Sequence, residues 1–340
     1  MSLIVILKPQ ADESTVDHVC DRIRELGLSP HVSRGDLRTL IGAIGEGAPA
    51  KQEMLEQLEG VESVTPITKP YKLASRDFHA ADTVIDIRGV KIGGNHAAVI
   101  AGPCAIESRD LLFEVGRRVK QAGAAMLRGG AYKPRTSPYA FQGIGREGLQ
   151  MLRDAGDELE MPVITEVIDP RDVAEVAEYT DVLQVGARSM QNYNLLMEVG
   201  RTDKPVFLKR GLSATVQELL MSAEYVMSQG NHNVILCERG IRTFETSTRF
   251  TLDISAVPVL RRECHLPIYV DPSHAAGKRD FVADLARAGI AAGAHGVMVE
   301  VHTNPDKALC DGPQALLPVE FQKLMTQLRQ IAAICGKEMS

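Results

Sequence analysis

Eight short apolar runs recur along this chain, and each leads into a residue that can bind an anion or a metal. The runs are 97–104, 124–130, 162–167, 181–188, 205–210, 234–240, 268–274 and 296–302. They deliver Cys104, Arg128, Glu166, Arg188, Lys209, Arg239, His274 and Glu300. Near-continuous Val, Ile and Leu with little alternation is typical of parallel strands that are buried on both faces. Their spacing, one strand plus one covering helix, predicts an α/β chain folded as a (β/α)8, or TIM, barrel with its site at the C-terminal ends of the strands.

The first 75 residues lie outside such a barrel and have a pattern of their own. They predict strand 3–8, helix 14–26, a β-rich stretch 30–44, helix 49–58 and strand 62–67. The order β-α-β-β-α-β indicates a small α+β domain of the ferredoxin-like type. We therefore expect a regulatory or oligomerisation domain over 1–75, a linker and barrel-capping hairpin over 76–96, and a catalytic barrel over 97–340. A mere packing extension is the alternative interpretation of residues 1–75.

Composition limits the partners that the chain can have. A net charge of −6 and a pI near 5.9 disfavour a nucleic-acid partner. The sequence has no apolar stretch long enough to cross a membrane and no signal-peptide pattern, so a cytoplasmic location is expected. The six scattered cysteines of a chain this size predict reduced thiols and no disulfide framework. In the fifth helix of the barrel, Ser213 is the expected N-cap.

Basic residues stand out at the ends of the runs against this acidic total. They are Arg128, Lys133, Arg135, Arg188, Lys209 and Arg239. Cations that converge on one barrel mouth repel one another unless anions lie among them. The set therefore predicts two phosphorylated substrates and one carboxylate, because a phosphate carries about −1.5 to −2 charges. The alternative is that several of these residues pair with local carboxylates such as Glu147 or Glu245.

A second group of residues suits a metal ion. Cys104, His274, Glu300 and Asp311 offer a thiolate, an imidazole and two carboxylates from strands one, seven and eight and the following loop. These strands adjoin in a closed barrel, so the four side chains can meet. Mixed sulfur, nitrogen and oxygen ligation suits Mn²⁺, Fe²⁺, Zn²⁺ or Co²⁺ better than Ca²⁺ or Mg²⁺. Taken singly, Cys104 can be a buried small hydrophobe, His274 a core histidine and Asp311 a turn residue.

Several strings of the chain resemble those of one enzyme family. They are GPCAIES (102–108), LRGGAYKPRTSPYAFQG (127–143), VGARSMQN (185–192), LKRG (208–211), DPSHAAGKRD (271–280) and VEVHTNPDKALCDGPQ (299–314), with FHAADTVI (78–85) before them. The chain closely resembles 3-deoxy-D-arabino-heptulosonate 7-phosphate (DAHP) synthase, type I beta, which carries an N-terminal ferredoxin-like regulatory domain. The resemblance implies condensation of phosphoenolpyruvate with erythrose 4-phosphate, which opens the shikimate pathway.

The resemblance also implies a role for each site residue. The implied ligands of one divalent metal ion are Cys104, His274, Glu300 and Asp311. Groups around the phosphoenolpyruvate carboxylate are Arg128, Lys133 and Lys209, and its phosphate is held by Arg188, Arg239 and the backbone near Ala187. Glu166 orders a water molecule, while Arg135, Thr136 and Ser137 bind the phosphate of the acceptor. Lys133 is the implied proton donor, and it acts beside Cys104 and His274. One departure from the family is Cys310, where a small residue such as serine is expected.

Two rival functions can be weighed against this one. 3-Deoxy-D-manno-octulosonate 8-phosphate synthase uses arabinose 5-phosphate in a similar barrel, but that family resembles K-A-N-R-S-S where this chain has KPRTS (133–137). A catalytically silent barrel that serves as an amino-acid sensor or scaffold conflicts with the retention of four ligands and six basic residues. By resemblance we also expect tyrosine or phenylalanine as an effector and a homotetramer or homodimer. The sequence identifies neither the native metal nor the effector.

Overall fold

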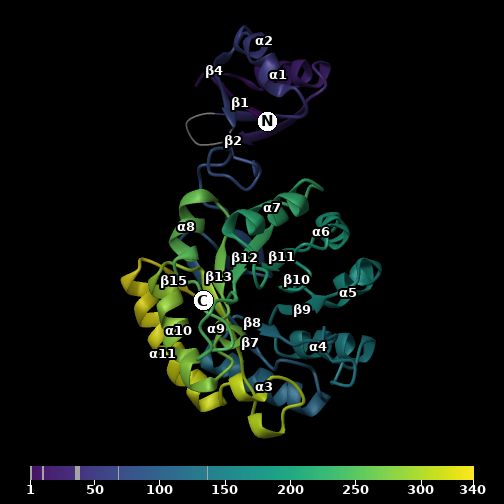
Figure 1. The fold of residues 1–340 in the computed structure, drawn as a ribbon, viewed down its shortest axis with the longest axis vertical. Coiled ribbons are helices and arrows are strands. Elements are labelled where there is room, and N and C mark those ends of the chain that lie inside the picture. The colour runs from purple at the N-terminus through teal and green to yellow at the C-terminus, as the bar shows by residue number, and fades with distance from the viewer. Residues whose placement is uncertain (1, 10, 35–38, 68, 136) are drawn as a thin grey trace. The chain divides into compact units, whose positions relative to one another are not determined.

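The structure, a computed structural model, describes residues 2–9, 11–34, 39–67, 69–135 and 137–340. The chain divides into two compact units. One comprises Met1–Asp82 with Glu263–His265, and the other comprises Thr83–Arg262 with Leu266–Ser340. Figure 1 shows the first in purple and blue, and the barrel of the second in colours from blue to yellow.

The first unit has the predicted ferredoxin-like order. Its elements are β1 (Ser2–Leu7), α1 (Glu13–Glu25), β2 (Ser29–Arg34), β3 (Thr39–Ile44), a 3₁₀ turn (Ala48–Lys51), α2 (Gln52–Glu56) and β4 (Val61–Ile67). The four strands form an antiparallel sheet in the order β2-β3-β1-β4. Alternate residues of β1, Leu3, Val5 and Leu7, are fully buried and belong to one apolar cluster with residues of α1. The side chains on one face of the strand thus pack against the apolar face of the helix.

Eight parallel strands close the barrel of the second unit, which confirms the predicted fold. They are β7 (His96–Gly102), β8 (Met126–Arg128), β9 (Val163–Val167), β10 (Val182–Val185), β11 (Val206–Lys209), β12 (Val234–Glu238), β13 (Ile268–Val270) and β14 (Gly296–Glu300). Each strand pairs with its neighbours in sequence, and β14 pairs with β7 to complete the ring. A short strand, β15 (Glu338–Met339), adds to the start of β7.

Helices follow the strands and cover the outside of the barrel (Figure 1). They are α3 (Arg109–Ala122), α4 (Arg146–Glu158), α5 (Val173–Tyr179), α6 (Tyr193–Gly200), α7 (Val216–Met227), α8 (Ala256–Glu263), α9 (Pro272–Ala276), α10 (Arg279–Ala291) and α11 (Pro318–Ile334). The prediction that Ser213 caps α7 is wrong. Thr215 is the N-cap, because its hydroxyl accepts from the Glu218 N–H while the Glu218 carboxylate accepts from the Thr215 N–H, a reciprocal pair that Ser213 lies too early to make.

A β-hairpin fills the N-terminal end of the barrel. Its strands are β5 (Ile85–Ile87) and β6 (Val90–Ile92), and they are joined by a turn in which Arg88 and Gly89 both have positive φ. Two such residues define the tight turn that matches the twist of paired strands. Ile85, Ile87 and Ile92 are buried in one apolar cluster with the residues at the starts of the barrel strands. This end is therefore packed with side chains, which leaves the opposite end for a site.

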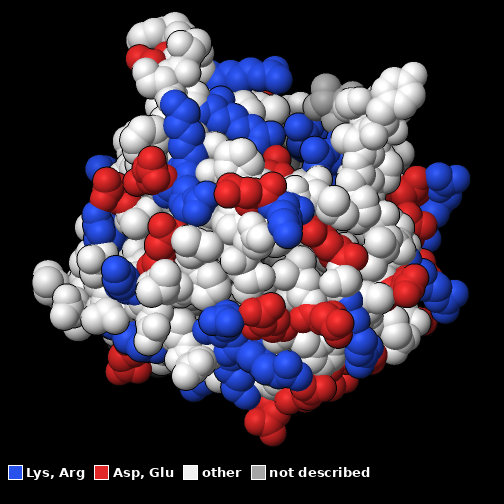
Figure 2. All heavy atoms as spheres, turned by 90° about the horizontal axis from the view of Figure 1, so that it is seen from below, with Lys and Arg blue, Asp and Glu red and all other residues white. Residues whose placement is uncertain are grey.

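None of the described helices is both long enough and apolar enough to span a membrane. On the face of the molecule shown in Figure 2, basic and acidic side chains lie next to one another across much of the surface.

Candidate active site at the C-terminal end of the barrel

A cavity of about 260 Å³ opens where the strands end. Its lining includes most of the residues predicted for the site, namely Arg128, Lys133, Arg135, Ser137, Glu166, Ala187, Arg188, Lys209, Arg239, His274 and Asp311. It also includes residues that the sequence did not single out for this site, among them Gln184, Gly186 and Arg249. Thr136 lies outside the described residues. Segments far apart in the sequence therefore contribute to one polar cavity.

The four predicted metal ligands lie together. One donor atom from each of Cys104, His274, Glu300 and Asp311 lies within 4.8 Å of the others. Cys104 follows β7, Glu300 ends β14, and Asp311 lies in the loop after β14. His274 is not at the end of a strand as expected. The seventh strand ends at Val270, and His274 lies on the five-residue helix α9.

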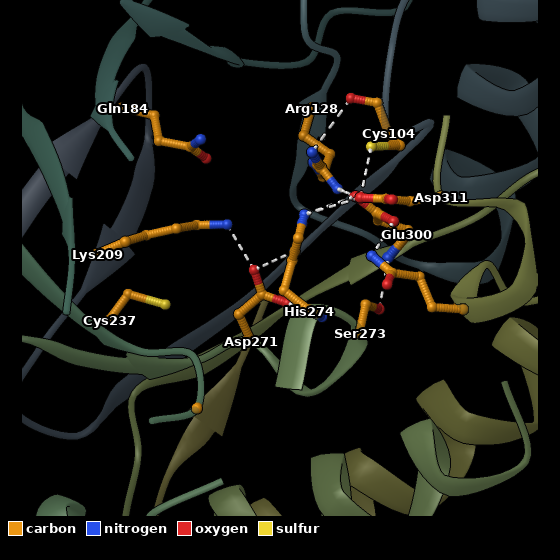
Figure 3. A network of polar contacts seen from close by, with 12 residues as sticks. Cys104, Arg128, Gln184, Lys209, Cys237, Asp271, Ser273, His274, Glu300 and Asp311 are labelled. Carbon is orange, nitrogen blue, oxygen red and sulfur yellow. Dashed lines mark hydrogen bonds and ion pairs between the residues drawn. The ribbon is translucent and has the colours of Figure 1, made fainter. Parts of the chain in front are cut away.

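The environment of His274 suits a neutral ligand (Figure 3). Its Nδ1 lies 2.7 Å from Oδ2 of Asp271, while its Nε2 lies 3.2 Å from Oε1 of Glu300 and 3.9 Å from Oδ2 of Asp311. Burial lowers the pKa of His274 below its ordinary value, although the Asp271 and Glu300 carboxylates act in the opposite direction. A hydrogen bond from Nδ1–H to a buried carboxylate is the usual way in which proteins orient a metal-binding imidazole.

Two hydrogen bonds stabilise Glu300 as a carboxylate. It accepts hydrogen bonds from Nη1 of Arg128 at 2.6 Å and from Nε2 of Gln314 at 2.7 Å, and the Ser273 hydroxyl accepts from its backbone N–H. Burial alone would raise the pKa of Glu300, but His274 and Arg128 lower it well below its usual range. An ionised carboxylate is the form that binds a cation.

The Cys104 sulfur atom lies near Lys133, Cys310 and, at 3.7 Å, Oδ2 of Asp311. It lies 3.2 Å from Nζ of Lys133 and 3.2 Å from Sγ of Cys310, to which it donates. That hydrogen bond, together with burial, raises the pKa of Cys104, and the same hydrogen bond lowers the pKa of Cys310. A divalent cation among the four donors would displace the proton of the Cys104 thiol. The thiol, the imidazole and the two carboxylates thus fit the mixed donor set of a transition-metal site.

Of the six basic residues, two form ion pairs with carboxylates, and Lys133 contacts the carbonyl oxygen and the sulfur of Cys104. Arg128 pairs with Glu300, and Lys209 pairs with Asp271. Neither Glu147 nor Glu245 forms an ion pair with any of the six within the described ranges, and Glu245 accepts instead from the backbone of Thr246 and Ser247. Local pairing with those two glutamates is therefore wrong for the part of the chain that the structure describes.

Three arginines of the cavity have no carboxylate partner among the described residues: Arg135, Arg188 and Arg239. Arg239 is buried, its guanidinium lies 4.5 Å from the centre of the Phe250 ring, and its Nη1 has no hydrogen-bond partner in the described part of the chain. Buried charged groups are normally paired. A guanidinium fixed in this way therefore favours an anionic ligand in the cavity.

The Glu166 carboxylate extends into the cavity past Gly186, which has no side chain. Its Oε2 accepts from Nε2 of Gln184 at 3.1 Å. A Cβ on Gly186 would lie 2.0 Å from Oε1 of Glu166, so that position cannot carry a side chain without displacing the carboxylate. Gly186 also precedes Ala187 and Arg188 in the cavity wall.

Two carboxylates that the sequence reasoning missed hold the site together. Asp271 begins the segment DPSHAAGKRD (271–280) and is the N-cap of α9, where its carboxylate accepts from the N–H of His274. Glu107 accepts from the N–H of Leu309 at 2.9 Å and so ties the loop after β7 to the loop that carries Asp311. Asp311 itself has φ of 50°, a strained conformation for a residue other than glycine and one that is often found at functional sites.

Comparison with known proteins places the chain in a family. A model of the DAHP synthetase I family matches residues 76–334, and a model of the DAHP synthase ferredoxin-like domain matches residues 3–69. Phospho-2-dehydro-3-deoxyheptonate aldolase from Thermotoga maritima is 50% identical over 338 residues, covering 99% of this chain and 100% of that protein. The crystal structure of the Thermotoga maritima enzyme superimposes with a TM-score of 0.80, covering 100% of this chain and 99% of that one.

More distant relatives carry the other activity. 2-Dehydro-3-deoxyphosphooctonate aldolase from Syntrophobacter fumaroxidans is 34% identical over 267 residues, which are 73% of this chain and 92% of that protein. The octulosonate alternative is therefore not favoured. Family models over both units and a full-length relative at 50% identity agree, so the chain belongs to the DAHP synthetase I family of enzymes and carries its ferredoxin-like domain.

Proposed function

We propose that this enzyme condenses phosphoenolpyruvate, erythrose 4-phosphate and water to give DAHP and phosphate, the first step of the shikimate pathway. One observation carries the proposal: a candidate metal group adjoins a cavity with three arginines that lack a carboxylate partner among the described residues. Two phosphorylated substrates bring the anions that such a cavity requires. In this proposal Arg188 and Arg239, with the backbone near Ala187, bind the phosphate of phosphoenolpyruvate.

Lys133 serves as the proton donor. Burial opposes its charge, but the Cys104 and Cys310 sulfurs raise its pKa above the ordinary value, so its ammonium group stays protonated. Its Nζ lies 3.1 Å from the carbonyl oxygen of Cys104 and so is directed at the metal group. From there Lys133 gives a proton to the alkoxide oxygen that forms from the aldehyde group of the acceptor.

A divalent cation held by Cys104, His274, Glu300 and Asp311 would supply Lewis acidity toward that aldehyde. Mn²⁺, Fe²⁺, Zn²⁺ and Co²⁺ all suit the donors. Lys209 and Arg128 lie at the cavity wall, where they orient the carboxylate of phosphoenolpyruvate. Glu166 orders the water that adds to C2 of phosphoenolpyruvate, the carbon from which phosphate then leaves. Fixing both substrates can contribute up to about 7–11 kcal/mol to lowering the barrier.

Arg135 and Ser137 bind the phosphate of the acceptor, and the family resemblance adds Thr136. Both described residues line the cavity on the loop after β8. KPRTS at 133–137 is one residue shorter than the corresponding string of the octulosonate enzymes, which suits the shorter sugar phosphate. The reaction then takes place in the cytoplasm, in a homotetramer or homodimer that tyrosine or phenylalanine inhibits through the ferredoxin-like domain.

Product analysis with labelled substrate tests the proposal. Phosphoenolpyruvate carrying ¹⁸O in its bridging C–O–P position is incubated with enzyme, divalent metal and either erythrose 4-phosphate or arabinose 5-phosphate. The expected result is a seven-carbon product from erythrose 4-phosphate, with the label in the released phosphate because the C–O bond breaks. Faster turnover of arabinose 5-phosphate, or label that stays in the sugar product, would overturn it.

A further inference from the structure

Two cysteines from distant parts of the chain meet beside the cavity. Cys104 lies in the loop after β7 and Cys310 in the loop after β14, and their sulfur atoms are 3.2 Å apart. Both are free thiols and both side chains are buried. Together with Ala105 and Phe141 they form a small apolar cluster. Cys310 also lines the cavity, where a small reagent can reach it, whereas Cys104 is not among the lining residues.

We propose that Cys104 and Cys310 form a site of reversible oxidation, at which hydrogen peroxide joins them in a disulfide. In the proposed reaction Cys310 neither binds substrate nor transfers a proton, so the oxidation site goes beyond that reaction. Only its consequence for metal binding rests on the proposed function, because that consequence requires Cys104 to be a ligand.

The chemistry balances in two steps. The Cys310 sulfur attacks one oxygen of the peroxide, the O–O bond breaks, and a sulfenic acid and water result. The Cys104 sulfur then attacks the sulfenic sulfur, the S–O bond breaks, and the hydroxyl group leaves as a second water molecule. Two thiols lose two protons and two electrons, and one peroxide is reduced to two waters. An added dithiol reverses the bond by thiol–disulfide exchange.

The required movement is small and falls on a loop. The sulfur atoms must approach from 3.2 Å to about 2.05 Å. Cys310 lies between two short 3₁₀ turns, Pro305–Lys307 and Gly312–Gln314, and not in a barrel strand. The strands of the barrel can therefore stay in place while the loop moves by about one ångström.

The modification competes with the metal. A sulfur atom that is bonded to another sulfur is no longer a thiolate, so oxidation removes one of the four donors of the candidate metal group. Conversely, a cation held by Cys104 keeps that sulfur from completing the disulfide. Metal therefore protects the pair, and oxidation weakens metal binding, because each excludes the other.

The test uses the full-length enzyme after removal of metal, treated with a small excess of hydrogen peroxide. We expect the intact mass to fall by two hydrogen atoms, a cross-linked peptide that contains Cys104 and Cys310, and a return to the original mass with dithiothreitol. Saturation with Mn²⁺ before peroxide should prevent the change. Cys310→Ser is expected to gain oxygen at Cys104 instead, while Cys237→Ser, which alters another buried thiol, should still form the cross-link.

Two outcomes have different consequences. If peroxide adds oxygen to Cys104 equally in the wild type and in Cys310→Ser, with no cross-linked peptide in either, the oxidation site is overturned. If the cross-link forms but calorimetry shows unchanged Mn²⁺ affinity, Cys104 is not a ligand, and the proposed function is contradicted while the oxidation site stands. We expect the oxidised enzyme to bind Mn²⁺ at least about tenfold more weakly.

Discussion

At the scale of single residues, Asp271 holds two groups of the site in place. Its fully buried carboxylate binds Lys209 Nζ and His274 Nδ1, and Figure 3 shows both side chains converging on it. Burial acts to raise the pKa of Asp271, but His274 and Lys209 lower it well below the ordinary value. One carboxylate thereby fixes the orientation of a candidate ligand and of a basic residue in the cavity wall.

Replacing this carboxylate should weaken metal binding without destroying the barrel. Asp271→Asn is expected to lower divalent metal affinity by about 10–100-fold, because the His274 ring loses its charged partner. Calorimetric titration of the metal-free protein measures the change. Asp280→Asn, on the exposed start of α10, serves as the matched control and should bind as the wild type does. Equal affinity of Asp271→Asn and the wild type would contradict the role given to Asp271.

The buried imidazole predicts how stability depends on pH. Burial lowers the pKa of His274 in the folded protein, so the unfolded chain takes up this proton more readily. The contribution of His274 to stability is therefore complete above its unfolded pKa of about 6.5 and is lost as the pH falls toward the folded value. Glu300 and Asp271, whose pKa values are also lowered, add losses of the same sign at more acidic pH.

Chemical denaturation of the metal-free enzyme tests this expectation. The free energy of unfolding should decrease between about pH 7 and pH 5.5, with a slope of at most about 1.4 kcal/mol per pH unit for this proton. His274→Asn should be less dependent on pH in that interval. If the two proteins show the same slope, the His274 proton is not coupled to folding.

Residue types at the strand ends predicted which side chains meet, but not how they pair. Arg128 and Lys209 were grouped with the anion-binding residues, yet each forms an ion pair with a buried carboxylate. The partners are Glu300 at the end of β14 and Asp271 just after β13. In both pairs one strand lies between the two partners, so the pairing depends on the stagger of the strands around the barrel, which the sequence does not display. The Cys104–Cys310 contact depends on the paths of two loops, which the apolar runs do not predict, although Cys310 stood out as a departure from the family.

At the scale of elements, the loop after β14 is anchored to the loop after β7. The Glu107 carboxylate accepts from the N–H of Leu309 and lies 3.7 Å from Nε2 of His302. This contact fixes the segment that leads to Asp311, whose backbone is strained. A strained residue persists only where its surroundings hold it, and Glu107 provides one such constraint.

Removing the anchor should release the loop. Glu107→Ala is expected to weaken metal binding by roughly the lost hydrogen bond to a charged group, about 1.5–3 kcal/mol. Glu114→Ala removes an exposed carboxylate of α3 that pairs with Arg118, and it should have no effect on metal affinity. Calorimetric titration of both variants with divalent metal measures the two affinities. An unchanged affinity in Glu107→Ala would mean that the loop holds Asp311 without this contact.

Elements with long periodic patterns were predicted from the sequence, and local starts and ends were not. The eight strands follow from their apolar runs and the hairpin from its glycines, whereas the start of α7 at Thr215 depends on a reciprocal bond with Glu218. Likewise, a five-residue helix such as α9 is too short to show a periodic pattern, so His274 was assigned to the strand before it.

At the scale of the whole molecule, we expect the barrel to fold without the ferredoxin-like domain. A truncated form of the Thermotoga maritima enzyme has been solved, and it covers 79% of this chain and 98% of its own length with a TM-score of 0.74. Deletion of residues 1–75 from this chain should therefore leave a folded barrel that releases phosphate from phosphoenolpyruvate but is not inhibited by tyrosine or phenylalanine. Inhibition assays on both forms check this, and equal inhibition of the two would contradict a regulatory role for the domain.

The proposed reaction depends above all on the metal group at the mouth of the barrel. Its most direct test is the rate of phosphate release from phosphoenolpyruvate and erythrose 4-phosphate, measured in excess chelator and again after divalent metal is restored. We predict that chelation abolishes turnover, that metal restores it in the wild type, and that Cys104→Ala stays largely inactive while its circular dichroism is unchanged. Full activity of the wild type in excess chelator would contradict this prediction.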